Sequence, residues 1–165
     1  MDKLYMEYAD YLTGVCARYI SDEDEVKDVL QDSFIKIFTQ IHQFEYRGKD
    51  SLKAWITKVV INEALMYLRQ NKTFLVPIQE SDIVDCLDEE PEMENLGADI
   101  LFSFIQKLPP GYRAVFNLFV IEEKSHKEIA EILQIQPATS ASQFLRARKL
   151  LAEMIREYKH QMENR

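Results

Sequence analysis

Apolar residues recur at every third or fourth position through most of the first 73 residues, a spacing that lines one face of a helix. The pattern predicts three helices. The apolar face of the first consists of Leu4, Tyr8, Tyr11, Leu12, Val15 and Tyr19. The second begins after Ser21 or Asp22, either of which can cap it, and buries Val26, Val29, Leu30, Ser33, Phe34, Ile37, Phe38 and Ile41.

The third helix follows a break at "FEYRGKDS", where Gly48 permits a turn. Asp50 or Ser51 caps this helix, which runs to about Asn71. Its predicted inner side consists of Leu52, Trp55, Ile56, Val59, Val60, Ala64, Tyr67 and Leu68.

The periodicity is lost over residues 74–98, which contain Pro77 and Pro91, and it resumes in residues 99–165. There "DILFSFIQKL" predicts a short helix that ends at two prolines. "YRAVFNLFVIEE" predicts another, which buries Val115, Phe116, Phe119 and Val120.

The stretch "SHKEIAEILQIQPATSASQFLRARKLL" predicts a helix-turn-helix. Ser125 and Glu128 have the spacing of a capping box for its first helix. Pro137 suits the opening of its last helix, where a backbone N–H is not needed. The fold class predicted for the chain is therefore all-α: two small helical domains, residues 1–73 and 99–165, joined by a linker, with four helices in the second domain.

Charge divides the chain in the same way. Residues 74–98 hold 8 acidic residues and no basic one, which accounts for the whole formal net charge of −8. Residues 1–73 carry −2 and residues 99–165 carry +2, from 12 acids against 10 bases and 8 acids against 10 bases. The middle segment is thus an acidic linker, and the overall acidity does not exclude nucleic acid as a partner of either domain.

Composition argues against several other classes of protein. An apolar fraction of 47% suits a folded protein, yet no apolar run approaches the roughly 20 residues of a membrane span. The acidic, tyrosine-rich N-terminus differs from a signal peptide, so a cytoplasmic location is expected. Cys16 and Cys86 do not form a disulfide scaffold, and the three histidines have no metal-binding spacing. No metal, cofactor or catalytic constellation is predicted.

The last helix has two faces by spacing. Phe144, Ala147, Leu151, Met154, Ile155 and Tyr158 are predicted to face the core, and short polar and basic residues lie largely opposite. Such side chains suit a recognition helix in the major groove of DNA, and Leu145 can contact a thymine methyl. The outward set is Thr139, Ser142, Gln143, Leu145, Arg146 and Lys149. A merely solvated helix face would have a similar composition.

At this point the chain resembles a family, the extracytoplasmic-function class of bacterial sigma factors, over nearly its whole length. "LPPGYRAVFNLFVIEEKSHKEIAEIL" followed by "FLRARKLL" is similar to the family's fourth conserved region. "DEVKDVLQDSFIKIF" is similar to the core-binding helix of its second region, and "YRGKDSLKAWITKVVINEALMYLR" to the segment that recognises and melts the downstream promoter element.

The resemblance implies a role for each domain. The second would bind the upstream promoter element as duplex through Thr139, Ser142, Gln143, Leu145, Arg146, Arg148 and Lys149. In the first, Tyr46 and Asn62 match positions that line the pocket for a base flipped from the non-template strand. Arg47, Lys58, Arg69 and Lys72 would hold the single-strand backbone, whereas Trp55 is interpreted as mainly structural.

The resemblance also implies partners. Asp28, Gln31, Asp32 and Phe34 match the helix that docks on the clamp of the polymerase core, although burial inside the domain is an equal alternative for Phe34. The acidic linker would follow the RNA-exit path of the polymerase. Many relatives are held by an anti-sigma protein, and the resemblance implies a partner of that kind here.

The leading hypothesis is a promoter-specificity subunit of bacterial RNA polymerase that is not itself an enzyme. Two alternatives stay open at this point. One is a stand-alone helix-turn-helix regulator in which residues 1–73 sense a signal or dimerise. The other is a protein-interaction module that has lost DNA contact, favoured only by the uncharged "SASQ" at the start of the last helix. A small-molecule enzyme is the least favoured class.

Overall fold

The computed structural model describes residues 2–71 and 96–164, and within these ranges the chain is helical and contains no strand. The chain divides into two compact units, Met1–Lys72 and Thr73–Arg165. All the acidic residues of the predicted linker, together with Lys72 and Cys86, lie outside the described residues. None of the described helices is both long and apolar enough to cross a bilayer.

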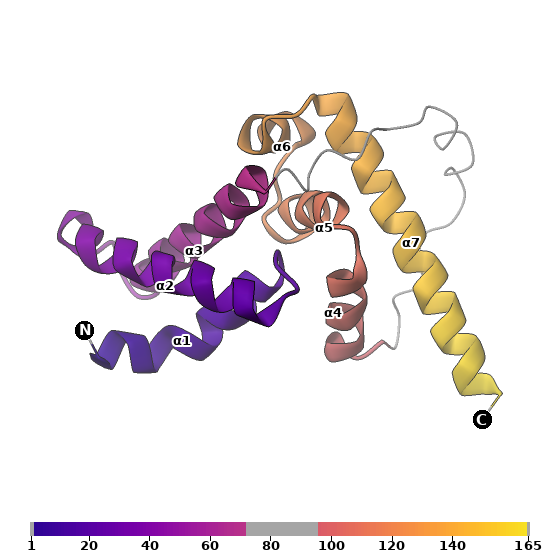
Figure 1. The fold of residues 1–165 in the computed structure, drawn as a ribbon, viewed down its shortest axis with the longest axis horizontal. Coiled ribbons are helices and arrows are strands. Elements are labelled where there is room, and N and C mark those ends of the chain that lie inside the picture. The colour runs from indigo at the N-terminus through magenta and orange to yellow at the C-terminus, as the bar shows by residue number, and fades with distance from the viewer. Residues whose placement is uncertain (1, 72–95, 165) are drawn as a thin grey trace. The chain divides into compact units, whose positions relative to one another are not determined.

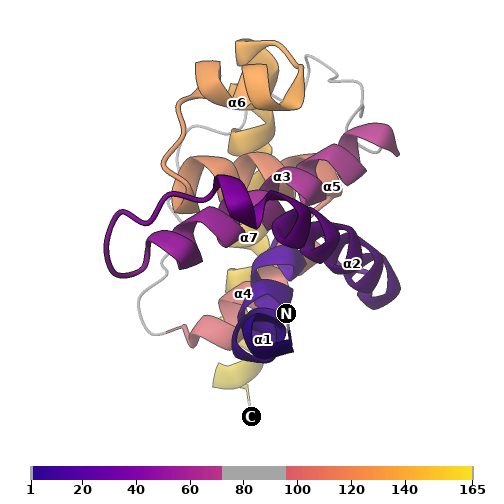
Figure 2. The ribbon, with the colours of Figure 1, turned by 90° about the vertical axis from the view of Figure 1, so that its left-hand side faces the viewer.

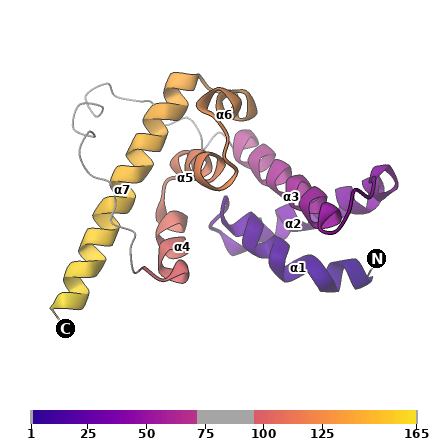
Figure 3. The same ribbon diagram turned by 180° about the vertical axis from the view of Figure 1, so that it is seen from behind.

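In its described residues the first unit consists of three helices and one short turn, and the helices are drawn in Figures 1 and 3. They are α1 (Asp2–Ala17), α2 (Glu23–Gln40), the 3-10 turn η1 (Ile41–Gln43) and α3 (Ser51–Gln70). Asp22 is the N-cap of α2 and accepts hydrogen bonds from the backbone amides of Asp24 and Glu25, both at 3.0 Å. One of the two capping residues predicted for this helix is thereby confirmed.

The core of the first unit is formed where the apolar faces of its three helices meet. Cys16 is a free, fully buried thiol in this core, and burial raises its pKa to about 12, so it packs as a small apolar side chain. The other fully or nearly fully buried side chains include Leu12, Val15, Tyr19, Ile37, Ile56, Val60 and Ala64.

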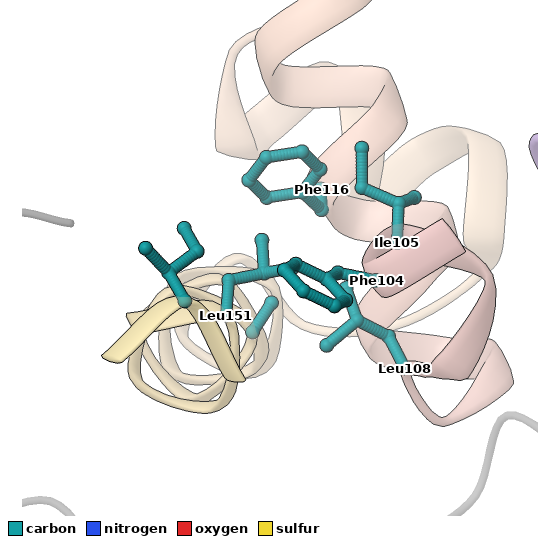
Figure 4. Close-up of a cluster of buried hydrophobic side chains, with 7 residues drawn as sticks. Phe104, Ile105, Leu108, Phe116 and Leu151 are labelled. Carbon is teal, nitrogen blue, oxygen red and sulfur yellow. The ribbon is translucent and has the colours of Figure 1, made fainter. Parts of the chain in front are cut away.

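The second unit contains α4 (Ala98–Lys107), α5 (Pro110–Phe116), the π-helical turn η3 (Asn117–Ile121), α6 (His126–Leu133) and α7 (Pro137–Glu163). In Figures 1 and 2, α6 leads through a tight turn into the long α7. The side chains of α4 and α5 pack on the middle of α7, as Figure 4 shows for Phe104, Ile105, Leu108, Phe116 and Leu151. The long α7 therefore contributes to the hydrophobic core that α4 and α5 cover.

The π-helical turn overturns one prediction. Val120 was expected to be buried as part of a regular helix, but it is 48% exposed, while Asn117 and Leu118 are buried. A π turn winds the backbone more widely than an α turn, so side chains within it, Val120 among them, leave their α-helical direction. Asn117 is the first residue of this turn, and its side-chain amide donates back to the carbonyl oxygen of Arg113 in α5 at 2.9 Å.

Candidate nucleic-acid interface

Local capping interactions determine where the helices of the helix-turn-helix begin and end. Ser125 Oγ accepts from the Glu128 amide, and the Glu128 carboxylate accepts from the Ser125 amide at 2.8 Å, which completes the predicted capping box. The Ser125 amide and the Ser125 hydroxyl both donate to the Glu128 carboxylate, at 2.8 and 2.9 Å, and these two hydrogen bonds lower the pKa of Glu128. Gln134, with a left-handed φ of 57°, ends α6, and Pro137 opens α7.

A ring cluster joins the two helices of this motif. Nδ1 of His126, the first residue of α6, lies 2.9 Å from Oγ of Ser140, which is fully buried on α7. The imidazole stacks on Phe119, with 4.7 Å between ring centroids and 18° between planes, and also contacts Phe144 of α7. The orientation of α6 on α7 therefore depends on a partly buried, uncharged imidazole.

This cluster predicts a pH dependence. Burial lowers the pKa of His126 in the folded chain below its ordinary value of 6.5. The unfolded chain then binds the proton first, so the stabilisation is complete above about pH 6.5 and decreases as the pH falls through the folded pKa. We expect amide exchange in α6 and α7 of the full chain to accelerate more between pH 7.5 and 5.5 than in His126→Gln, after correction for intrinsic exchange. Equal acceleration in both proteins contradicts the prediction.

The outward face of α7 retains most of the predicted DNA-contacting side chains. Thr139, Ser142 and Leu145 are partly exposed near the start of the helix, and Lys149 is exposed one turn further on. Arg148 is partly exposed, with its guanidinium 5.9 Å from the centroid of the Phe144 ring. The face thus begins with hydroxyl and apolar groups and continues with cations.

Two predicted members of this face lie elsewhere. Gln143 is 1% exposed and Arg146 is 9% exposed, so the prediction that both point outward is wrong. α7 packs against α5 as well as α6, which widens its buried arc beyond the apolar stripe seen in the sequence. Arg146 lies 3.4 Å from the Tyr112 hydroxyl through its Nη1, and so contacts α5.

In the first unit, Tyr46 projects from a short loop between η1 and α3, and its side chain is 76% exposed. The loop is held at both ends. Phe44 packs on Trp55 with 5.6 Å between ring centroids, and Ser51 Oγ accepts from the Arg47 amide and donates to the Gly48 carbonyl. An aromatic ring is therefore presented to solvent on an anchored backbone.

The helix that follows this loop, α3, carries polar and basic side chains on one exposed face. Lys58 and Asn62 are exposed four residues apart, which places them on the same side of the helix, and the partly buried Arg69 follows two turns later. Trp55 is partly buried beneath the Tyr46 loop, in agreement with its structural interpretation. Arg47 is exposed and forms an ion pair with Glu45 at 2.9 Å. These side chains form a polar and basic surface beside an exposed aromatic ring.

The predicted polymerase-docking residues divide into two groups. Asp28, Gln31 and Asp32 are exposed on one side of α2. Phe34 is 6% exposed and packs between Tyr5 and Phe38, so the structural alternative considered for it is confirmed.

Sequence reasoning missed the apolar residue on this side of α2. Ile35 is 53% exposed and lies four residues after Gln31 and seven after Asp28, which places it on the same face. The sequence does contain a signal for it, because the spacing places an isoleucine on the same helix face as three polar residues. We call Asp28, Gln31, Asp32 and Ile35 the docking face.

Comparisons with known proteins agree with this two-unit arrangement. Family models describe residues 4–74 as sigma-70 region 2 and residues 98–151 as sigma-70 region 4. The chain is 30% identical to the ECF RNA polymerase sigma-E factor of Haemophilus influenzae over 164 residues, covering 92% of this chain and 85% of that protein. It is 25% identical to the ECF RNA polymerase sigma factor SigM of Bacillus subtilis, covering 92% of each.

A solved structure is similar in fold. It is the sigma factor RpoE of Bartonella quintana in a co-crystal with the anti-sigma factor NepR, with a TM-score of 0.51, 20% identity and coverage of 94% of this chain and 96% of that one.

A helical unit matching region 2 and a helix-turn-helix unit matching region 4 define the sigma-70 class of promoter-specificity subunits of RNA polymerase. Within that class, the chain belongs to the ECF sigma factors.

Proposed function

We propose that the first unit captures an unstacked base of the downstream promoter element at Tyr46 and Asn62. The observation that carries this proposal is the exposed Tyr46 ring on its anchored loop, next to the exposed face of α3. A base that leaves the duplex regains stacking energy on an aromatic ring, about 1–3 kcal/mol per base. Arg47, Lys58 and Arg69 provide positive charge for the adjacent phosphates.

The second unit, in this proposal, binds the upstream element in the major groove. Thr139, Ser142 and Leu145 contact base edges near the start of α7, and Arg148 and Lys149 contact phosphates. Gln143 and Arg146 support the helix from inside rather than contacting DNA. With so few contacts the unit binds duplex weakly alone, so the promoter is selected by both units together.

The docking face supplies the connection to the polymerase core. Three polar side chains around one exposed isoleucine have the composition of a small interface with an apolar centre and a polar rim. The chain contributes no catalytic group in this proposal, because the polymerase performs the chemistry, and it acts in the cytoplasm with that enzyme. An anti-sigma protein is a proposed regulator, by analogy with the Bartonella complex.

Run-off transcription on a library of genomic promoter fragments tests the proposal. Core polymerase with this protein is expected to initiate at a restricted set of fragments, and core alone is expected to initiate at none of them. The protein alone should bind duplex DNA weakly at about 0.15 M salt. Tight binding to a palindromic duplex without polymerase, and no change in transcription, would support the stand-alone regulator instead.

A further inference from the structure

Glu63 of α3 differs from every other acidic residue in ranges 3–71 and 96–164, because it alone is buried. Its residue exposure is 7%. The Lys36 ammonium of α2 donates to Glu63 Oε1, while the Lys36 side chain is 42% exposed. An ion pair therefore joins α2 to α3 at the edge of the core.

The pair lies between the two surfaces that the proposed function uses. Glu63 directly follows Asn62, whose side chain is on the exposed face of α3. Lys36 directly follows Ile35 and lies one turn after Asp32, both on the docking face of α2. The residues that hold the two helices together are thus the immediate neighbours of those expected to contact DNA and polymerase.

A buried carboxylate needs its partner, because its desolvation costs several kcal/mol unless an opposite charge and hydrogen bonds offset it. The pair adds little net stability over a well-packed apolar pair, but it disfavours other registers of the two helices. Register matters here: each residue adds 1.5 Å and about 100° along an α-helix. A slip of α3 by one residue would turn Asn62 away from its present direction.

We propose that Lys36 and Glu63 are positioning residues that fix the DNA-capturing face of α3 relative to the docking face of α2. Docking on polymerase then places Asn62 and Lys58 at a defined position and angle over the melted strand. This inference rests on the proposed function of the first unit. It assigns to the pair a role in promoter opening that is separate from folding and from polymerase binding.

The double variant Lys36→Met with Glu63→Leu tests the proposal, because it replaces the pair with apolar side chains and leaves no unpaired charge. We expect the full-length double variant to unfold at a urea concentration close to that of the native sequence. Unfolding is measured by the fluorescence of Trp55, the only tryptophan. Core polymerase should be bound within about twofold of native affinity. Open complexes, measured by permanganate reactivity of unpaired thymines, should decrease at least tenfold.

The conservative variant Glu63→Gln is the matched control, since its amide oxygen still accepts from Lys36. It is expected to recover most of the opening lost in the double variant. If the double variant does not fold, Lys36→Met with Glu63→Gln removes the contact while keeping a polar side chain. Native opening by any folded variant that lacks the contact would overturn the proposal. Absence of opening by the native chain with core would instead contradict the proposed function.

Discussion

Tyr46→Ala is expected to reduce open-complex formation about 5- to 150-fold, the range that corresponds to the loss of about 1–3 kcal/mol of base stacking. The ring is 76% exposed and contributes little to the core, so the substitution should change the stability of the first unit by less than about 0.5 kcal/mol. The measurement is permanganate reactivity of the downstream element, with core polymerase and a responsive promoter.

Tyr46→Phe is the matched control, because it keeps the ring and removes only the hydroxyl. It should retain most of the opening activity if stacking dominates. A deficit as large as that of the alanine variant would assign the effect to the hydroxyl rather than to the ring. Unchanged opening in Tyr46→Ala would remove this loop from the proposed capture site.

The elements with strong local signals were predictable from the sequence. Helix periodicity, the Asp22 cap, the Ser125–Glu128 capping box and Pro137 each depend on residues within a turn of one another. Tyr46 could be assigned to an exposed loop for the same reason, since a polar, glycine-containing stretch between two periodic segments already predicts it. In these places local chemistry and the final packing agree.

The positions that were not predictable depend on packing between distant segments. Gln143 and Arg146 are polar and fall on the flank of the apolar stripe of α7, but packing of α7 against α5 and α6 extends burial to that flank. Val120 lies within the π turn η3, whose wider winding changes the direction of its side chain. No periodicity count contains either effect, because the first depends on contact between helices and the second on a change in the winding of the backbone.

The Lys36–Glu63 pair shows the same limit in a polar setting. The two residues are separated by 27 positions, and each looks like an ordinary surface charge in the sequence. Only the packing of α2 on α3 reveals that one of them is buried.

Phe34 and Ile35 illustrate how one residue of helix phase changes a functional assignment. The resemblance assigned polymerase contact to Phe34, but Tyr5 and Phe38 surround that ring, and the adjacent Ile35 is the exposed apolar side chain. Phe34→Ala should therefore act through stability, at about 3–5 kcal/mol for a buried aromatic ring. Any loss of polymerase binding by this variant should accompany a lower urea midpoint of unfolding, measured by Trp55 fluorescence.

Ile35→Asp is expected to weaken binding to core polymerase at least tenfold while leaving the unfolding midpoint of the first unit nearly unchanged. The substitution places a carboxylate at the centre of the docking face, where complex formation would desolvate it without a partner. Titration of fluorescently labelled protein with core polymerase at fixed salt provides the affinity, and Trp55 fluorescence in urea provides the stability.

Met162→Asp is the matched control, since Met162 is 50% exposed on α7 and lies outside the docking face. It introduces the same charge on a similarly exposed apolar residue, so any effect of net charge alone would appear in both variants. Native affinity in Ile35→Asp would show that the apolar centre of the interface is elsewhere on the first unit. Loss of affinity in Ile35→Asp with no change in Met162→Asp, at equal stability, would locate it on α2, because only a desolvated contact distinguishes the two carboxylates.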